Sequence, residues 1–154
     1  MKKYGKQFVI VLLAAAVLMA LSSALGMGGA GGLVERTLKN DWQLELPRGY
    51  EVEYRRATDA KMKDGGLRYH ALMYADDTVL NDWLPWVSCT MPTAHADSAA
   101  ELAREVMDSL NVPGGERPDL QNSGVWYAEG GDGSELLLLH AEGDLRLYIV
   151  ESIR

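Results

Sequence analysis

The chain has 154 residues, of which 47% are hydrophobic, 24% charged and 8% aromatic. This is the composition of a single globular domain, and it excludes a disordered acidic chain, a collagen-like repeat and a multi-pass membrane protein. The charge is distributed unevenly, because no Asp or Glu precedes Glu35 while Lys2, Lys3 and Lys6 lie near the start. From Glu35 onward 12 basic side chains stand against 22 acidic ones, a balance of −10 that disfavours binding to nucleic acid.

The first predicted element is an apolar segment over residues 8–27, which contains no charge and no proline. Twenty helical residues span roughly 30 Å, the thickness of the hydrocarbon core of a bilayer. Residues 1–7 supply the basic region that precedes such a segment. A cleaved signal peptide and an uncleaved single-pass transmembrane helix both fit this pattern, and the sequence leaves the two open. In either case residues 1–7 stay in the cytoplasm and the following chain crosses the cell membrane.

Residues 28–33 are rich in glycine and are predicted to form a flexible linker. Residues 34–154 then form an extracytoplasmic domain, either anchored to the membrane or secreted. The single cysteine of the chain, Cys89, excludes an intrachain disulfide, so the domain depends on core packing alone. An exported domain with so little cysteine is typical of a bacterial protein.

Alternation of apolar and polar side chains predicts four strands in the first half of this domain, at 42–46, 50–55, 67–74 and 83–91. The strand at 67–74 is apolar on both faces, which predicts a central position in a sheet. Pro85 confines the start of the last of these strands to a sheet edge or a bulge. Turn-forming and polar residues predict the connecting loops, at 47–49, 57–66 and 76–82.

An amphipathic helix is predicted over residues 98–110, because Ser98 and Glu101 form a capping box before one apolar stripe. The remaining chain reads as a β-meander with strands at 124–129, 134–140 and 145–152. The predicted fold class is therefore α+β: an antiparallel sheet with one amphipathic helix packed on it, preceded by the hydrophobic N-terminal helix.

No local motif specifies a catalytic or metal site. The histidines, His70, His95 and His140, are far apart in sequence, and HxH, HExxH, CxxC and GxSxG patterns are absent. The glycines at 130–133 are interpreted as a hairpin turn, and the acidic residues at 76–82 as a solvated loop. We therefore expect no cofactor, no metal and no catalytic residue, although a serine–histidine–carboxylate site assembled from distant residues stays open.

The sequence Trp83-Leu84-Pro85-Trp86 carries two aromatic rings that serve either as core or as a contact for a partner. Alternation along a regular strand places Trp83 inward and Trp86 outward, unless Pro85 introduces a bulge. Trp86 is therefore the candidate residue for contact with a partner.

The final hairpin, GGDGSELLLLHAEGDLRLYIVES over residues 130–152, resembles that of small membrane-anchored or secreted proteins of Gram-positive bacteria. The resemblance implies a leader helix followed by a β-rich domain, and it implies no activity. Those proteins often carry a His-Gly-Asp-Gly loop after their second strand. Residues 59–66 of this chain lack the histidine, so a site built on it is not carried over.

Two functional hypotheses follow. The first is a non-enzymatic extracytoplasmic module that binds an envelope protein or a surface polymer, and the second is a small envelope hydrolase with a dispersed active site. The positions of His70, His95 and His140 discriminate between them. A histidine within hydrogen-bonding reach of a serine and a carboxylate in a cleft would favour the hydrolase.

Overall fold

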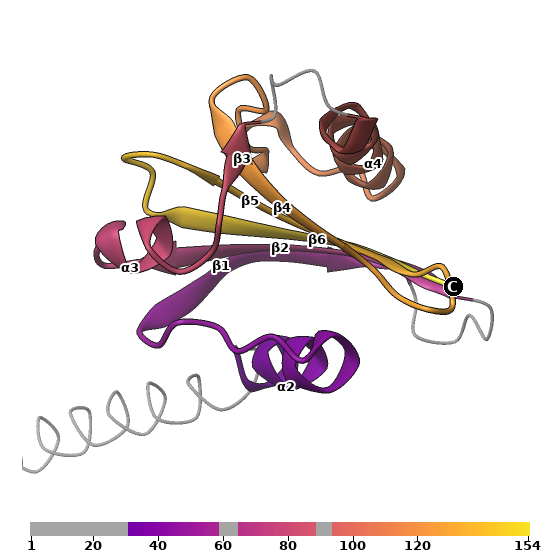
Figure 1. Cartoon of the computed structure of the whole chain (residues 1–154), viewed down its shortest axis with the longest axis horizontal. Coiled ribbons are helices and arrows are strands. Elements are labelled where there is room, and N and C mark those ends of the chain that lie inside the picture. The colour runs from indigo at the N-terminus through magenta and orange to yellow at the C-terminus, as the bar shows by residue number, and fades with distance from the viewer. Residues whose placement is uncertain (1–30, 59–64, 89–93) are drawn as a thin grey trace, which may run out of the picture.

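The computed structural model describes residues 31–58, 65–88 and 94–154 (Figure 1). The apolar segment at 8–27, predicted to be a signal peptide or membrane anchor, lies outside these residues. Within the described ranges, no helix has both the length and the apolar character needed to cross a membrane.

The described chain forms a six-stranded antiparallel sheet with the strand order β1-β2-β6-β5-β4-β3. Its strands are β1 (Tyr50–Ala57), β2 (Gly66–Tyr74), β3 (Val87–Ser88), β4 (Ser123–Glu129), β5 (Glu135–Ala141) and β6 (Arg146–Ile153). An antiparallel sheet accompanied by helices confirms the predicted α+β class. The central position predicted for 67–74 is also confirmed, because β2 pairs with β1 on one side and β6 on the other.

The C-terminal meander predicted from turn residues is confirmed as β4, β5 and β6. Gly133 and Gly143 have φ angles of 80° and 79°, a left-handed conformation that favours glycine in the two connecting turns. In the first turn the Asp132 carboxylate accepts a hydrogen bond from the Ser134 backbone N–H at 2.9 Å.

Helix α4 (Ala94–Ser109) covers one face of the sheet, called here the α4 face (Figure 1). Its predicted apolar stripe is buried. The core on this face consists of Tyr69, Ala71, Ala99, Leu102, Ala103, Val106, Met107, Val112, Val125, Leu137, Leu139, Tyr148 and Val150. The helix begins before Ser98, so the predicted capping box is wrong about the boundary. Alanines at 94, 96, 99 and 100 favour helix through that position.

The opposite face is covered by helix α2 (Gly31–Trp42), an element that the sequence pattern did not predict (Figure 1). Residues 31–33 form its first turn, so the flexible linker predicted over 28–33 is wrong at these three residues, and the folded domain includes residue 31. The core on this α2 face consists of Val34, Leu38, Leu46, Leu72, Tyr74, Leu80, Leu136, Leu138, Leu147 and Ile149. Val34, Leu38 and Trp42 recur every four residues and so form one apolar stripe. The fold therefore has helices on both faces of the sheet, where the prediction placed one helix on one face.

The predicted strand at 42–46 does not form, because α2 continues to Trp42 and the chain then turns. Gln43 has a φ of 54°, and the Leu44 N–H donates to the Leu38 carbonyl oxygen at 3.1 Å. This is the αL termination common at helix ends. Leu46 is buried beneath the turn. The alternation of apolar and polar residues at 42–46 therefore reflects buried side chains but not a strand.

The segment between β2 and α4 also differs from its prediction. Residues expected to form a loop contain a short helix, α3 (Thr78–Asn81), and the strand predicted over 83–91 is confined in the described residues to Val87–Ser88. Pro85 has no N–H to donate to a β-ladder, which accounts for the late start of β3. Residues 89–93, including Cys89, lie outside the described chain.

Candidate binding surface

All four tryptophans of the chain lie on the α2 face of the sheet. They come from three parts of the structure, with Trp42 at the end of α2, Trp83 and Trp86 between α3 and β3, and Trp126 on β4. Each is partly buried against the α2-face core, whereas the α4-face core contains no tryptophan. Tryptophan is enriched at protein interfaces, because its large ring offers contact area at low entropic cost.

Trp83 and Trp86 form one aromatic unit. Their ring centroids are 6.3 Å apart with an interplanar angle of 64°, the edge-to-face arrangement that aromatic rings favour. The Trp86 Nε1–H donates to the Leu80 carbonyl oxygen at 2.8 Å, which ties this ring to α3. A Cβ atom on Gly124 would lie 2.9 Å from the Trp86 Cβ, so only glycine on β4 accommodates this close approach.

The prediction that the two rings point to opposite faces is wrong in its geometry. It assumed a regular strand, but residues 83–86 precede β3, and both rings pack against the same core. Trp86 stays the candidate contact residue, now as part of a pair.

His140 supports Trp86 from beneath. The ring centroids are 5.7 Å apart, and the imidazole is 3% exposed. Its Nε2 lies 3.1 Å from the Asn81 Oδ1, and its Nδ1 lies 3.1 Å from the Arg146 carbonyl oxygen. These contacts join α3, β5 and β6 below the aromatic pair, and a buried, hydrogen-bonded ring of this kind holds the surface above it in place.

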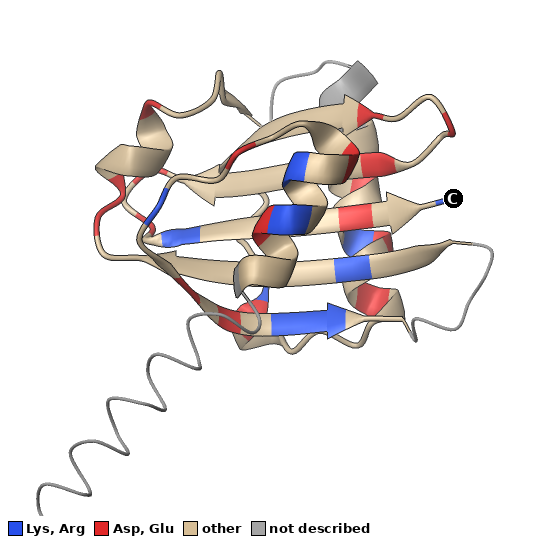
Figure 2. Cartoon of the chain, turned by 90° about the horizontal axis from the view of Figure 1, so that it is seen from below, with Lys and Arg blue, Asp and Glu red and all other residues tan. Residues whose placement is uncertain are grey.

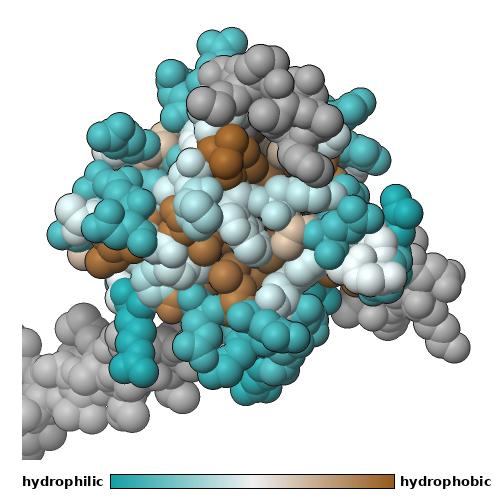
Figure 3. Space-filling view, in the orientation of Figure 1, coloured by the Kyte–Doolittle hydropathy of each residue, from teal (hydrophilic) through white to brown (hydrophobic). Residues whose placement is uncertain are grey.

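Exposed apolar side chains also lie beside the aromatic pair. Val79 on α3 and Leu145 in the β5–β6 turn are 42% and 40% exposed. Figure 3 views the sheet from its edge, with α4 above and α2 below as in Figure 1, and shows apolar patches in the centre, where the segment from α3 to β3 crosses the front in Figure 1, with hydrophilic side chains around them. We call Val79, Trp83, Leu84, Trp86 and Leu145 the tryptophan band.

Acidic residues surround the α3 end of the tryptophan band (Figure 2). Asp76 accepts a hydrogen bond from the Thr78 backbone N–H, which lowers the pKa of its carboxyl. Asp77 Oδ2 accepts one from the Gly143 N–H at 3.2 Å and thereby joins α3 to the β5–β6 turn. Asp82 is exposed. No set of three or more metal-ligating side chains occurs within the described residues.

A buried ionic cluster, which sequence analysis missed, lies beneath the end of α2. Glu151 on β6 is 1% exposed, and burial raises the pKa of its carboxyl. It accepts a hydrogen bond from the Trp42 Nε1–H at 2.9 Å, and its Oε2 lies 3.7 Å from Arg68 Nη1 on β2. The indole and the guanidinium compensate the carboxylate where α2 docks on the sheet.

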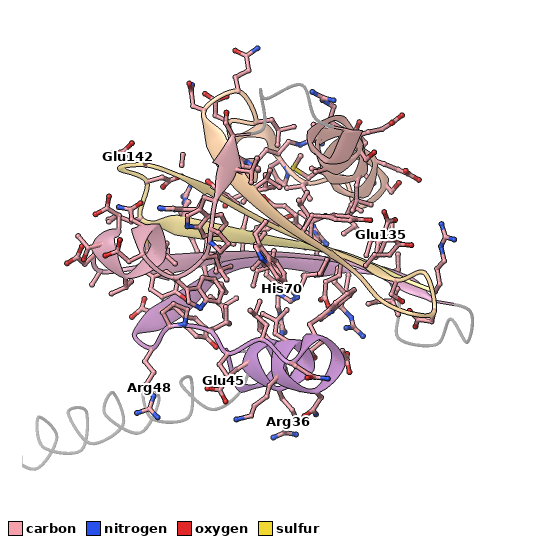
Figure 4. The ribbon with its side chains drawn as sticks, viewed as in Figure 1. Arg36, Glu45, Arg48, His70, Glu135 and Glu142 are labelled. Atoms are coloured by element: carbon pink, nitrogen blue, oxygen red, sulfur yellow. The ribbon has the colours of Figure 1, made fainter. Side chains whose placement is uncertain are left out.

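His70 lies on the α2 face between the sheet and α2 (Figure 4). Burial, aided by the positive charges of Arg68 and Arg55, lowers its pKa to about 4. Its Nδ1 is buried and has no hydrogen-bond partner. The ring is therefore neutral near pH 7, and charging it is unfavourable while α2 covers it.

The histidines that discriminate between the two functional hypotheses show no serine–histidine–carboxylate site among the described residues. His140 bonds to an amide and a backbone carbonyl, and His70 Nδ1 is unpartnered, so neither histidine shows a serine–histidine pair. His95 lies in α4 with its side chain outside the description. No protein-family model, curated protein or solved structure matches this chain.

Proposed function

We propose that residues 31–154 act as a non-enzymatic, extracytoplasmic binding module of the bacterial envelope. The apolar segment at 8–27 exports or anchors the domain, and the tryptophan band contacts an envelope protein or a surface polymer. Trp86 is the central contact residue.

One observation supports binding above all others: every tryptophan of the chain is partly buried on the same face. Each ring in this position is fixed by the core on one side and leaves part of its surface for another molecule. A fixed ring loses little conformational entropy when a partner arrives, which is why such side chains dominate binding energy at interfaces.

The composition of the α4 face also favours the α2 face as the binding surface. On the α4 face the partly buried rings among the described residues are two tyrosines, Tyr54 and Tyr127, and none is a tryptophan. A partner that requires aromatic contact is therefore expected on the α2 face.

The first test concerns location. A reporter that is active only outside the cytoplasm is fused after Arg154 of the full chain. We expect an active reporter, since the lysines of residues 1–7 hold the N-terminus inside. A stable fusion that is active only in the cytoplasm would refute the extracytoplasmic placement.

The second test maps the contact. A photocrosslinking amino acid replaces Trp86 in the full chain within native membranes, and a matched variant carries it at the exposed Glu101 of α4. We expect a discrete protein or polymer adduct from position 86 and none from position 101. The same adducts from both positions, or no adduct from position 86 in a folded chain, would count against the tryptophan band as the contact surface.

A further inference from the structure

The charged side chains in the chain segment that carries most of the tryptophan band are all acidic. No lysine or arginine occurs between Tyr69 and Ala103, a stretch that includes α3 and most of the band. Asp76, Asp77 and Asp82 lie there. Helix α3 is joined to the β5–β6 turn, which adds Glu142 and Asp144, and Glu142 points outward in Figure 4.

These carboxylates are not neutralised within the described chain. The ion pairs between described residues use other acids, namely Asp41, Glu45, Glu53, Asp108 and Glu151. The nearby Arg146 is engaged elsewhere, because its Nε and Nη2 donate to the two carboxylate oxygens of Glu53 at 2.6 and 2.9 Å. The α3 end of the tryptophan band, called here the acidic end, therefore retains negative charge that a positively charged partner can offset.

The acidic end is also held in place. Asp77 bonds to the Gly143 N–H, and His140 connects Asn81 with the Arg146 carbonyl oxygen. Apolar side chains and carboxylates thus keep fixed positions relative to one another. A partner pays little to order such a surface on binding.

The apolar rings and the carboxylates together favour one class of partner for the tryptophan band over the others. A second copy of this chain would bring the same carboxylates to the same surface, and like charges at an interface oppose association. Anionic lipids and phosphate-bearing polymers are repelled for the same reason. An uncharged glycan can donate hydroxyl hydrogen bonds to the carboxylates but offsets none of their charge, whereas a basic peptide with apolar side chains satisfies both parts of the surface.

We infer that the tryptophan band receives a basic, amphipathic peptide segment of a partner protein, an inference that rests on the proposed binding function. Aliphatic or aromatic side chains of the segment pack on Trp83, Leu84 and Trp86. Its lysines or arginines pair with Asp82 and Glu142, which are exposed beside the band. The carboxylates speed association and select the partner, and the rings supply contact area.

The test uses the full chain in nanodiscs of zwitterionic lipid, with its tryptophans replaced by fluorotryptophan. Three fluorescent peptides of equal length share the same leucine positions and carry lysine, glutamine or glutamate elsewhere. We expect the lysine peptide to bind about tenfold more tightly than the glutamine peptide at low salt. It should shift the fluorine signals of Trp83 and Trp86.

Matched variants separate this site from general attraction to an acidic domain. Asp82→Asn with Glu142→Gln removes two charges beside the band, and Glu101→Gln with Glu105→Gln removes two exposed charges from α4. We expect the first double variant to weaken the lysine peptide by about fivefold, and the second to stay within about twofold of the parent chain. Equal weakening by both would overturn the inference.

The peptide panel also separates failure of the inference from failure of the proposed function. Equal affinity of the lysine and glutamine peptides, with the same shifts at Trp83 and Trp86, would overturn the basic partner and leave the band as a binding surface. Peptide binding without any shift at these rings would overturn the inference as well. In that case the crosslinking experiment at position 86 decides whether the band binds another class of partner.

Discussion

The two faces of the sheet are covered by different means. On the α4 face a helix of 16 residues buries alanine, leucine, valine and methionine against apolar strand positions that include two buried tyrosines, Tyr69 and Tyr148. On the α2 face a helix of 12 residues shares the covering with α3 and the chain that follows it. The first arrangement is an ordinary apolar core, whose contribution to stability follows from buried area.

The α2 face departs from that pattern in three ways. It contains the four partly buried tryptophans, a buried glutamate and a buried histidine nitrogen without a partner. Polar burial is costly and partly exposed rings leave apolar surface in water, so these features stabilise the fold less than fully buried apolar side chains would. Both faces therefore contribute an apolar core, and the α2 face in addition carries the tryptophans and the buried polar groups.

The largest effect is expected on the α4 face. Met107 is 2% exposed, and Met107→Ala should destabilise the domain by about 2–5 kcal/mol, since it leaves a cavity in the core. Binding at the tryptophan band should be unchanged at temperatures where the variant is folded. Denaturant unfolding measures the loss, and Leu33→Ala, at a position that is 56% exposed, is a control that should stay within about 0.5 kcal/mol. If Met107→Ala lowered the free energy of unfolding by less than Leu33→Ala, the α4 face would not be the stabilising core that the contrast between the two faces requires.

The second prediction concerns acid and His70. Its pKa is about 4 in the folded state against an ordinary value of 6.5, so the unfolded chain binds more protons between these values. The stability that neutral His70 permits is therefore complete above pH 6.5 and is lost as the pH falls toward 4, by about 3 kcal/mol in all.

His70→Phe should remove this acid sensitivity, because it cannot be charged and needs no partner for Nδ1. The measurement is the difference in unfolding free energy between the parent and the variant across pH 4–7. Glu151 acts in the opposite direction, since its raised pKa makes folding favour its protonated form, but it is common to both chains and cancels. A pH-independent difference would show that His70 is charged or solvated in the folded domain.

The third prediction separates charge from hydrogen bonding at Glu151. Its raised pKa means that the ionised carboxylate is disfavoured by burial, so Glu151→Gln should not destabilise the domain at pH 7 and still accepts the Trp42 N–H. Glu151→Leu leaves that N–H without its acceptor and should cost about 1–3 kcal/mol. If both variants cost the same, the ion pair with Arg68 outweighs the hydrogen bond.

Local patterns predicted the regular parts of the fold. Turn glycines and alternation placed β4, β5 and β6, and the 3.6-residue period placed α4, because these signals lie within a few neighbouring residues. The sequence missed α2 for a local reason. Its glycine start obscures the helix, and the alternation at 42–46 fits a strand as well as a helix end followed by a buried leucine.

Less of the candidate site than of the fold could be predicted from the sequence. The sequence proposed Trp86 as a candidate contact residue, but its pairing with Trp83 on one side depends on the late start of β3, and its contact with His140 depends on strand order. A signal for Glu151 was present, since alternation through Leu147 and Ile149 directs it inward. Its partners on α2 and β2 are distant in sequence, so only the tertiary fold brings them together.

The smallest predicted effect distinguishes the two rings of the tryptophan band. Trp86→Phe keeps an aromatic ring over His140 and Gly124 and loses the Nε1–H bond to the Leu80 carbonyl oxygen, so it should cost about 0.5–1.5 kcal/mol. Trp83→Phe keeps the edge-to-face contact and should stay within about 0.5 kcal/mol of the parent. Denaturant unfolding measures both, and the lysine peptide reports binding. We expect each variant to weaken the peptide, because each reduces the ring area offered to it. Loss of stability without loss of binding in both variants would assign the tryptophans to the core, and the two faces of the sheet would then differ in composition but not in purpose.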